Sequence, residues 1–347
     1  MREEVKRKEL LILDALKKIN GSATSRKLTE IIANLGYVVS ERTVRFYLKK
    51  MELKGLTVNH GKKGYSITDK GLKETESSLI IEKVGFLSSK IDQMAYAMSF
   101  DIDTLQGTVV VNVTVVDPEK FERKIPVVEK IFEKGYTMGE LLTFYGPGET
   151  VGHISIPKGK IGIGTVCSIT LNGVLLKHAI PTVSRFGGLL ELRNGKPYRF
   201  VEIIMYDGTS IDPLEIFVKS GMTDFLGAIY TGQGKIGASF REFPSESRNE
   251  VLRLAERMKK VGLGGLLEIG LPGHSILEIP VYQGRVGAVV VGGLNAVSVL
   301  EEVGVRTYSR TLAGLADFKN LFRYEEMRER IRDFTRPRLK GVKIQKA

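Results

Sequence analysis

The stretch SERTVRFYLKK, residues 40–50, decides the fold of the first part of this chain. Wound as an α-helix at 100° per residue, it gathers four apolar side chains in one narrow sector: Val44, Tyr47, Leu48 and Met51. The opposite side carries basic groups and one aromatic ring: Arg42, Arg45, Phe46 and Lys49. The pattern predicts a helix that buries one face and presents a basic face to a partner.

Helical spacing also runs through residues 4–19 and 26–36, so this stretch is the third of three short predicted helices. Ser25 and Ser40 are typical N-caps for the second and third helices. Two short alternating segments, LTVNHG and YSIT, are joined by Lys62-Lys63-Gly64 and predict a β-hairpin with a basic tip.

Three helices followed by such a hairpin is the element order of a winged helix-turn-helix, whose third helix enters the major groove of DNA. The candidate DNA-binding residues are Arg42, Thr43, Arg45, Phe46 and Lys49 on the helix, with Lys62 and Lys63 on the hairpin. A guanidinium can bridge two acceptors on guanine, so Arg42 or Arg45 is the expected base reader. The alternative is a winged domain that makes only protein contacts and whose basic face is merely solvated.

The net charge of +12 is unevenly distributed along the chain. Residues 1–79 hold 17 Lys/Arg and 10 Asp/Glu, and the tail 335–347 holds five basic residues and no acidic ones. The middle, residues 80–334, is therefore neutral. Basic ends on a neutral body indicate binding to a polyanion, most simply double-stranded DNA.

The remaining composition is that of an ordinary globular protein, with 42% hydrophobic and 27% charged residues. The longest apolar run, residues 286–300, contains Asn295 and is too short to span a membrane. The charged N-terminus shows no secretory segment, and the single cysteine, Cys167, allows no intrachain disulfide. We therefore expect a cytoplasmic protein with no membrane segment.

The neutral middle contains two segments with the same order of elements, about residues 107–178 and 234–302. Pro147-Gly148 recurs as Pro272-Gly273 at an offset of 125 residues. Each copy predicts a strand, a long helix, two or three strands and a short helix. The expected fold class is thus α+β: an N-terminal winged helix-turn-helix, then a pseudo-symmetric duplicated α/β sensor domain with a cleft between its halves. Duplication without a ligand is the alternative.

The stretch with the most candidate ligand-binding side chains is GTVCSITLNGVLLKHAIPTVSRFGGLLEL, residues 164–192. It predicts a strand, a turn that carries Cys167 and Ser168, and a helix that starts near Asn172. A helix N-terminus after a strand suits a carboxylate or phosphate, and Arg185 beside two glycines allows a bidentate clamp. The structural alternatives are a buried small filler for Cys167 and an acidic partner for Arg185.

No catalytic constellation stands out. The four histidines show no metal-ligand spacing, and Gly162 and Gly164 lack the third glycine of a dinucleotide site. Asp212-Pro213 with Glu215 predicts a helix start with a capping box. We therefore expect no enzyme activity, no metal and no cofactor.

The middle domain resembles the archaeal nitrogen-regulatory repressor family, NrpR, in GTVCSITLNGVLLKHAIP, SRFGGLLEL and DGTSIDPLEIF, and the resemblance covers about residues 5–325. It implies a transcriptional repressor of nitrogen-fixation and ammonium-assimilation genes that binds inverted-repeat operators as a homodimer. It also implies release from DNA by 2-oxoglutarate, a small dicarboxylate effector. The matching positions are ligand-site candidates: Thr165, Cys167, Ser168, Lys177, His178 and Arg185.

The chain departs from the fullest layout of that family, since some members carry two sensor domains and others lack the winged helix and act as co-repressors. Two alternatives therefore stay open: a different small anionic metabolite as the effector, or repression only together with a co-repressor partner. A rival of another class is a metabolic enzyme with an appended regulatory domain, which would need an acid–base pair near Cys167 or Arg185. The tail 335–347 lies outside the resemblance.

Overall fold

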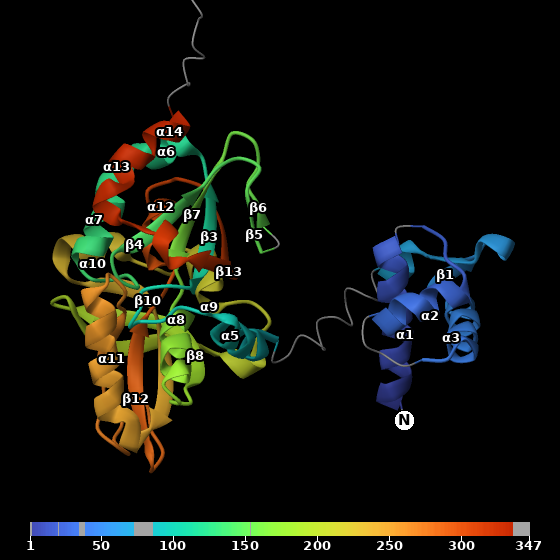
Figure 1. Cartoon of the computed structure of the whole chain (residues 1–347), viewed down its shortest axis with the longest axis horizontal. Helices are drawn as coiled ribbons and strands as arrows, with labels where there is room; N and C mark the ends of the chain where they lie inside the picture. The colour runs from blue at the N-terminus through green and yellow to red at the C-terminus, as the bar shows by residue number, and fades with distance from the viewer. Residues whose placement is uncertain (1, 20, 35–38, 73–85, 153, 336–347) are drawn as a thin grey trace, which may run out of the picture. The chain divides into compact units, whose positions relative to one another are not determined.

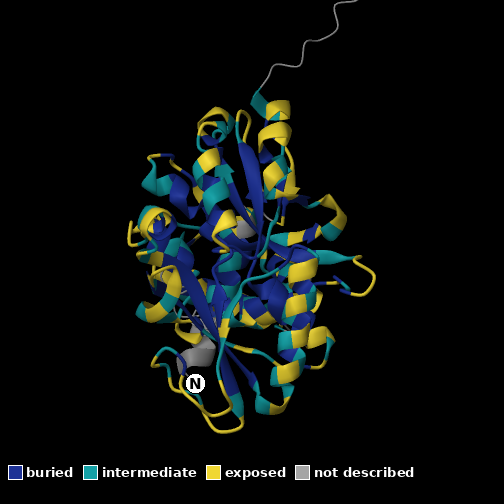
Figure 2. Cartoon of the chain, turned by 90° about the vertical axis from the view of Figure 1, so that its left-hand side faces the viewer, coloured by how far each residue is buried: buried dark blue, intermediate teal, exposed yellow. Residues whose placement is uncertain are grey.

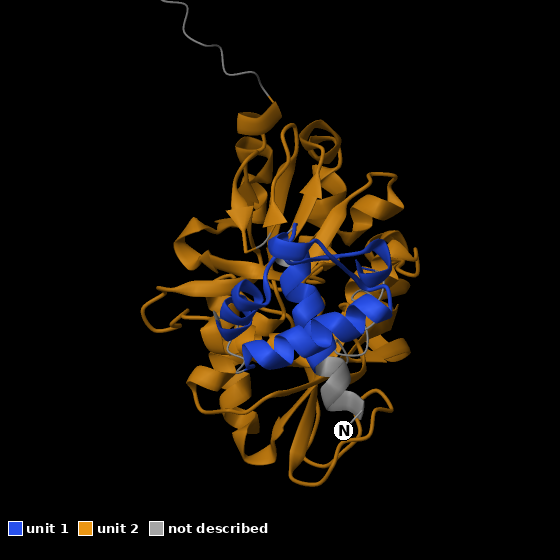
Figure 3. Cartoon of the chain, turned by 90° about the vertical axis from the view of Figure 1, so that its right-hand side faces the viewer, with its two compact units in different colours: residues 1–84 blue, residues 85–347 orange. Residues whose placement is uncertain are grey.

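The computed structural model describes residues 2–19, 21–34, 39–72, 86–152 and 154–335. The chain divides into two compact units, Met1–Val84 and Gly85–Ala347, which Figure 3 colours separately. Apart from Thr335, the predicted basic tail lies outside the described residues. Within them, no helix combines the length and apolar character needed to cross a bilayer.

The first unit has the predicted winged helix-turn-helix order (Figure 1). Its elements are α1 (Arg2–Ile19), α2 (Ser25–Asn34), α3 (Glu41–Leu53), β1 (Thr57–Asn59), the 3-10 turn η1 (Gly61–Lys63) and β2 (Tyr65–Ile67). β1 and β2 pair antiparallel, so the predicted hairpin is confirmed. The three helices enclose one apolar core, which includes Ile12, Leu16, Leu28, Ile32 and Leu48.

Of the two predicted N-caps in this unit, one is confirmed and one is wrong. Ser40 is the N-cap of α3, and its side chain accepts a hydrogen bond from the backbone N–H of Thr43 at 3.2 Å. Ser25, predicted as a cap, is instead the first residue of α2, and Thr24 accepts from the N–H of Lys27 at 3.4 Å. The Ser25 hydroxyl donates to Glu41 of α3 at 2.8 Å, so a contact between helices replaces the local cap.

The second unit is built on two five-stranded antiparallel sheets. The first has the order β13-β3-β7-β4-β14: Tyr308–Asp317, Thr108–Val116, Ile161–Val166, Leu141–Tyr145 and Phe322–Arg323. The second has the order β11-β12-β10-β8-β9: Leu266–Ile269, Arg285–Val291, Gly234–Pro244, Val183–Arg193 and Lys196–Met205. A small hairpin adds β5 (Thr150–Val151) and β6 (Ile154–Ser155).

Helices cover these sheets, and Figure 2 shows buried strands in dark blue among helices whose outer faces are exposed. They are α5 (Phe86–Ala97), α6 (Pro118–Glu122), α7 (Ile125–Glu133), α8 (Ile169–Lys177), α9 (Pro213–Lys219), α10 (Phe225–Thr231), α11 (Arg248–Lys260), α12 (Asn295–Glu302), α13 (Met327–Arg330) and α14 (Arg332–Thr335). Short 3-10 turns, η2 (Tyr206–Gly208), η3 (Ser245–Ser247), η4 (Phe318–Asn320) and η5 (Tyr324–Glu326), connect them.

The structure bears out the duplication and extends it by one strand in each copy. The first copy runs β3, α6 and α7, β4, the small hairpin β5–β6, β7, α8, and the second runs β10, α11, β11, β12, α12, without that hairpin. The strand after each copy joins the sheet of the other: β8 pairs with β10, and β13 pairs with β3. Neither repeat therefore completes its sheet without a strand from the other.

Two helix predictions need correction. The long helix expected after Asp117 is split into α6 and α7, because Pro126 lacks the N–H and clashes with the preceding turn. Asp117 itself is an N-cap as expected and accepts from the N–H of Lys120 at 3.1 Å. The helix expected near Asn172 begins at Ile169, so Asn172 lies inside α8.

Candidate functional site

The basic face predicted on α3 is exposed. Its buried residues are Val44, Tyr47, Leu48 and Met51, whereas Arg42, Arg45, Phe46 and Lys49 face outward. The Phe46 ring is 63% exposed although it packs edge-on against Tyr47, with the ring centroids 5.4 Å apart. A large aromatic ring left in water beside three cations suits a surface that meets a polyanion.

The two arginines of this face are held differently. Arg45 donates to Glu41 at 2.7 Å, and Glu41 also accepts from Ser25. These hydrogen bonds, first that from Ser25 and then that from Arg45, hold the pKa of Glu41 below its usual value. Arg42 has no ion-pair partner in the part of the chain that the structure describes. The ion pair with Glu41 thus fixes the direction of the Arg45 guanidinium, whereas no ion pair within the described chain holds the Arg42 guanidinium in one direction.

The remaining predicted DNA-binding residues differ in whether they support the fold or face outward. The Thr43 hydroxyl lies 2.8 Å from the Ser40 hydroxyl at the N-cap, so it supports the start of α3. Lys62 and Lys63 are exposed on η1, at the tip of the hairpin. By contrast, Lys54 pairs with Glu9 of α1 at 2.7 Å and serves the packing of the unit.

The second unit contains a buried guanidinium, Arg241 on β10, with an exposure of 0%. It donates only to neutral oxygens: the Asn172 amide, the Ser184 hydroxyl at 2.6 Å, the Ser168 hydroxyl at 2.8 Å and the Ser239 hydroxyl at 3.2 Å. Its Nε has no hydrogen-bond partner in the part of the chain that the structure describes. Among the described residues, no carboxylate lies within ion-pair distance of it. We call Arg241 and these four partners the Arg241 site.

A buried cation without an anion is costly, and burial accordingly lowers the pKa of Arg241. A guanidinium nevertheless stays protonated in proteins, so the site keeps its positive charge. The free Nε–H and the surrounding hydroxyls are the donors that a carboxylate accepts. The arrangement therefore favours a small anion.

Three further groups surround the guanidinium. Burial raises the pKa of the Cys167 thiol to about 11, so Cys167 is a neutral thiol near neutral pH. Burial, with a smaller contribution from Glu215, raises the pKa of Asp212 to about 7. Burial also raises the pKa of Tyr206. Since Asp212 is partly protonated near pH 7, it can donate a hydrogen bond to an incoming carboxylate instead of repelling it.

The segment 206–217 ties this site to the opposite sheet. Asp212 caps α9 as predicted and accepts from the N–H of Leu214 at 2.8 Å. Glu215 does not close the predicted capping box. It accepts instead from the N–H and hydroxyl of Thr311 at 2.7 and 2.9 Å, and from Arg310 at 3.0 Å. The bulge of β13 offers these unpaired donors, which outcompete the local cap.

The six predicted ligand residues do not all meet. Cys167 and Ser168 lie in the turn between β7 and α8, and Thr165 donates to the Gly293 carbonyl at 2.8 Å beside it. Lys177 and His178 lie at the other end of α8, about 13 Å away along a nine-residue helix. There Lys177 donates to the Ser99 carbonyl at 2.5 Å.

Arg185 makes an ion pair in this structure. It donates to Glu242 at 2.7 Å and to the Pro280 carbonyl at 3.1 Å. The pairing of β8 with β10 shifts register here, and Arg185 is the extra residue between Ser184 and Phe186. Ser184 contacts Arg241, whereas Arg185 contacts Glu242, the next residue of β10. The acidic-partner alternative describes the position of Arg185 in this structure.

Sequence reasoning missed Arg241, Asn172 and Ser184 as members of the site. The available signal was the charged pair Arg241-Glu242 between Phe240 and Phe243 of GASFREFP, in a predicted strand. A charged residue at such a position is seldom buried without a partner.

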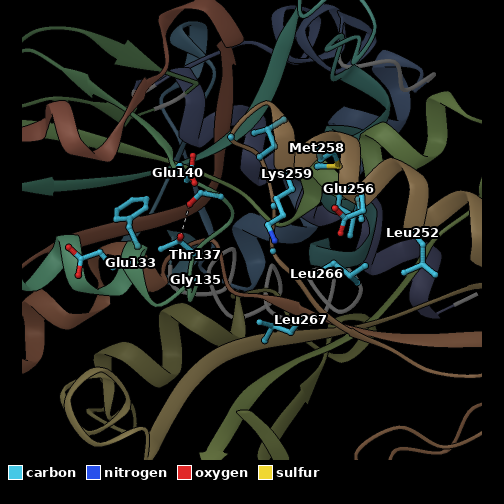
Figure 4. Close-up of a pocket in the computed structure, with 18 residues that line it drawn as sticks. Glu133, Gly135, Thr137, Glu140, Leu252, Glu256, Met258, Lys259, Leu266 and Leu267 are labelled. Carbon is cyan, nitrogen blue, oxygen red and sulfur yellow. Dashed lines mark hydrogen bonds between the residues drawn. The ribbon is translucent and has the colours of Figure 1, made fainter. Parts of the chain in front are cut away.

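A pocket of about 380 Å³ lies between the two repeats, lined by the C-terminal parts of α7 and α11 and by Leu171 (Figure 4). None of the six predicted ligand residues lines it. Its charged side chains are Glu133, Glu140, Glu256 and Lys259, and Glu140 pairs with Arg323. The remaining carboxylates make it a poor site for a dianion compared with the Arg241 site.

Comparisons with known proteins agree with both units. The family profile "NrpR regulatory domains NRD1 and 2" matches residues 84–323, and the profile "Ribonuclease R winged-helix domain" matches residues 10–75. A crystal structure of a nitrogen repressor-like protein from Methanococcus jannaschii is similar, with a TM-score of 0.58 and 27% identity, over 68% of this chain and 97% of that one.

Curated relatives give the same picture. The global nitrogen regulator NrpRI of Methanosarcina mazei is 34% identical over 92% of this chain and 99% of its own length. The global nitrogen regulators NrpR of Methanococcus maripaludis and Methanocaldococcus jannaschii are 28% and 29% identical over 91% and 86% of this chain. The chain spans about half of these two, 54% and 52% of their lengths.

Proposed function

The chain belongs to the NrpR family of nitrogen regulators, and from this premise we propose that it represses nitrogen-assimilation and nitrogen-fixation genes as a homodimer on inverted-repeat operators. Family membership and the winged helix support a transcriptional regulator, and the role we propose for the chain is non-enzymatic. We further propose that 2-oxoglutarate releases it from DNA by binding at the Arg241 site.

The DNA side of the proposal is supported by the exposed basic face of α3. Arg45, aligned by Glu41, is the proposed base reader, and Arg42 and Lys49 contact phosphates or bases beside it. Lys62 and Lys63 on the wing contact the flanking backbone. Two such units on a two-fold axis match two half-sites of a palindrome.

The effector side is carried by one observation: a fully buried guanidinium with a free Nε–H and no carboxylate partner in the described chain. A carboxylate of 2-oxoglutarate would accept from Arg241 and Ser168, and Cys167 and Asp212 lie near the same guanidinium. Because Arg241 is closed off from solvent, the ligand enters only when the surrounding elements separate.

That separation supplies the coupling between the two ligands. The Arg241 site joins residues of α8, β8 and β10, so opening it changes how the two sheets meet. An effector that favours the open arrangement weakens DNA binding by the same factor by which DNA weakens effector binding. A coupling of about 1–3 kcal/mol changes affinity roughly 5–150-fold, which is enough for a switch.

The test is fluorescence anisotropy of the chain on a palindromic promoter fragment from a nitrogen-assimilation gene, over a salt series, with and without millimolar 2-oxoglutarate. The proposal predicts salt-sensitive binding that the keto acid reverses, and at least several-fold weaker binding by Arg45→Ala with unchanged effector binding. Binding that ignores 2-oxoglutarate but responds to phosphate or another carboxylate would favour the other-anion alternative. Binding that appears only after a second sensor-domain protein is added would favour a co-repressor.

A further inference from the structure

The outermost strand of the second sheet has a free edge. β9 (Lys196–Met205) pairs with β8 on one side, and its other side has no backbone hydrogen-bond partner among the residues that the structure describes. None of its ten residues is buried. β13, which corresponds to β8 in the other repeat, is an edge strand too, but α5 and α9 pack against it.

This edge also exposes apolar side chains. Tyr198 is 44% exposed, Ile203 47% and Met205 38%. A long strand that offers unpaired N–H and C=O groups together with apolar side chains is a template for another strand. Proteins that stay monomeric shorten or cover such an edge, or protect it with charges, proline or bulges. Lys196 and Pro197 protect the N-terminal end of β9, so the C-terminal half with Ile203 and Met205 is the more open part of the edge.

The charges along β9 indicate which strand fits. The N-terminal half carries Lys196 and Arg199, and the C-terminal half carries Glu202, with Asp207 just beyond it. Arg199 already pairs with Glu191 of β8 at 2.7 Å, whereas Lys196 and Glu202 have no ion-pair partner within the described chain.

In the antiparallel register that sets Lys196 of each chain opposite Glu202 of the other, two Lys–Glu pairs form. Residue 199 then lies on the axis, where each Arg199 keeps its ion pair with Glu191 of its own chain. A parallel copy would oppose like charges, which is unfavourable. Two antiparallel strands related by a two-fold axis also form a closed pair, because the same patch serves both chains. The charge order therefore favours a second copy of β9 over an unrelated strand.

We propose that two copies of this chain associate through antiparallel pairing of their β9 strands, which joins the two second sheets into one continuous sheet. The free N–H and C=O groups of β9 supply the backbone hydrogen bonds across such a pair, although Pro197 has no N–H to donate and two register shifts interrupt the regular pairing of β9 with β8. Tyr198, Ile203 and Met205 become covered at the same time. The inference rests on the proposed dimeric repressor and assigns the surface that forms the dimer.

The test is sedimentation of the full chain and of Ile203→Lys, with Leu271→Lys as the matched control. Leu271 is 57% exposed and lies outside β9, so both variants place a lysine at an exposed apolar position. The wild type and Leu271→Lys are expected to sediment as dimers, and Ile203→Lys as a monomer or with a dissociation constant raised at least tenfold. A dimer that survives Ile203→Lys unchanged would overturn the β9 surface while leaving the dimeric repressor intact.

Reversing the charges of Lys196 and Glu202 distinguishes a loss of strand pairing from a loss of folding. Glu202→Lys is expected to weaken the dimer, and the double variant Lys196→Glu with Glu202→Lys is expected to restore it. Failure of that rescue, in folded variants, would count against antiparallel pairing of β9. A monomeric wild type at micromolar concentration would contradict the proposed homodimer itself, which distinguishes the two failures.

Single cysteines along residues 198–203 locate the two-fold axis, because the native Cys167 is buried. In an antiparallel pair, only the residue at the axis meets its own copy, so oxidation should give one maximum near the middle of the strand. Uniform cross-linking along the strand would indicate a parallel pair, and absence of cross-linking at all six positions would contradict the surface.

Discussion

Where the second repeat carries Arg241, the first repeat carries Thr114. The register of the strands establishes this correspondence, since Arg241 lies opposite Ser184 of β8 and Thr114 lies opposite Ser309 of β13. The Thr114 and Ser309 hydroxyls bind each other at 2.8 Å and need no ligand. In the other repeat, Ser184 accepts from a cation whose hydrogen-bond acceptors in the described chain are all neutral oxygens.

Contacts that hold the backbone are, in contrast, repeated in both copies. Thr170 of α8 donates to the Val110 carbonyl at 3.2 Å, and Asn295 of α12 donates to the Gly237 carbonyl at 2.8 Å. Different side chains thus make equivalent hydrogen bonds between a helix and the first strand of its repeat. We call these two hydrogen bonds, from Thr170 and from Asn295, the locks. The comparison teaches that duplication preserved the fold in both halves and placed anion-binding chemistry in one, so we expect one effector per chain.

The largest expected effect comes from making the second repeat resemble the first at this position. Arg241→Met removes the cation and should weaken 2-oxoglutarate binding at least a hundredfold by calorimetry, because a buried charge pair that loses one partner costs about 2–5 kcal/mol. Thr114→Val is the matched control and should bind like the wild type. Arg241→Lys keeps the charge without the planar fork and should fall between them. If Arg241→Met bound 2-oxoglutarate as tightly as the wild type, the effector would not bind at the Arg241 site.

A smaller effect is expected from Asn172→Val, which gives α8 an apolar residue like Val297 of α12. The guanidinium loses one acceptor, and a hydrogen bond to a charged group contributes about 1.5–3 kcal/mol. We expect roughly tenfold weaker effector binding in the same titration and a lower midpoint in urea. Val297→Asn, the reverse change, should create no second binding event, and a stoichiometry of two would contradict the one-site interpretation.

A substitution of Asp212 tests the electrostatics around Arg241. Its folded-state pKa of about 7 is above the usual carboxyl value, so between about pH 4 and pH 7 the folded chain holds a proton that the unfolded chain has released. This group therefore lowers the free energy of unfolding as pH rises through that window, and the loss is complete above about pH 7. Asp212→Asn keeps an N-cap and should remove this component from urea titrations at pH 5, 6 and 8. An unchanged pH slope would show that Asp212 titrates normally.

The smallest effect is expected at the two locks. Thr170→Val and Asn295→Leu should each lower the free energy of unfolding by about 1 kcal/mol, since the carbonyls keep the N–H donors of Cys167 and Gly292. Neither should change effector affinity more than about twofold. Chemical denaturation with parallel calorimetry measures both, and a large loss of effector binding in either variant would mean that the locks and the site are not separate.

The first unit was predictable because its signals are local. The apolar sector of α3 and its Ser40 cap lie within a dozen residues, and the wing follows from two short alternating segments around Lys62-Lys63-Gly64. Ser25 was the exception, because its hydroxyl binds Glu41 on another helix. A contact of that kind depends on tertiary packing, which periodicity does not report.

The Arg241 site was only half predictable. Ser168 stood out because a strand, a turn and a helix follow one another in the sequence. Arg241 did not, since it is one of 52 Lys/Arg and its burial results from the exchange of β8 and β13 between the repeats. Whether Ser184 or Arg185 approaches Arg241 was not predictable, because a register shift in the pairing of β8 with β10 interrupts simple alternation at this point.

The central claim is that Arg241 links the effector to DNA release. The direct measurement is operator anisotropy with millimolar 2-oxoglutarate for three proteins: the wild type, Arg241→Lys and Thr114→Val. We predict equal affinity for DNA without effector, release of the wild type and Thr114→Val on addition of the keto acid, and retention of Arg241→Lys on the operator. Release of Arg241→Lys at the wild-type effector concentration would contradict the account.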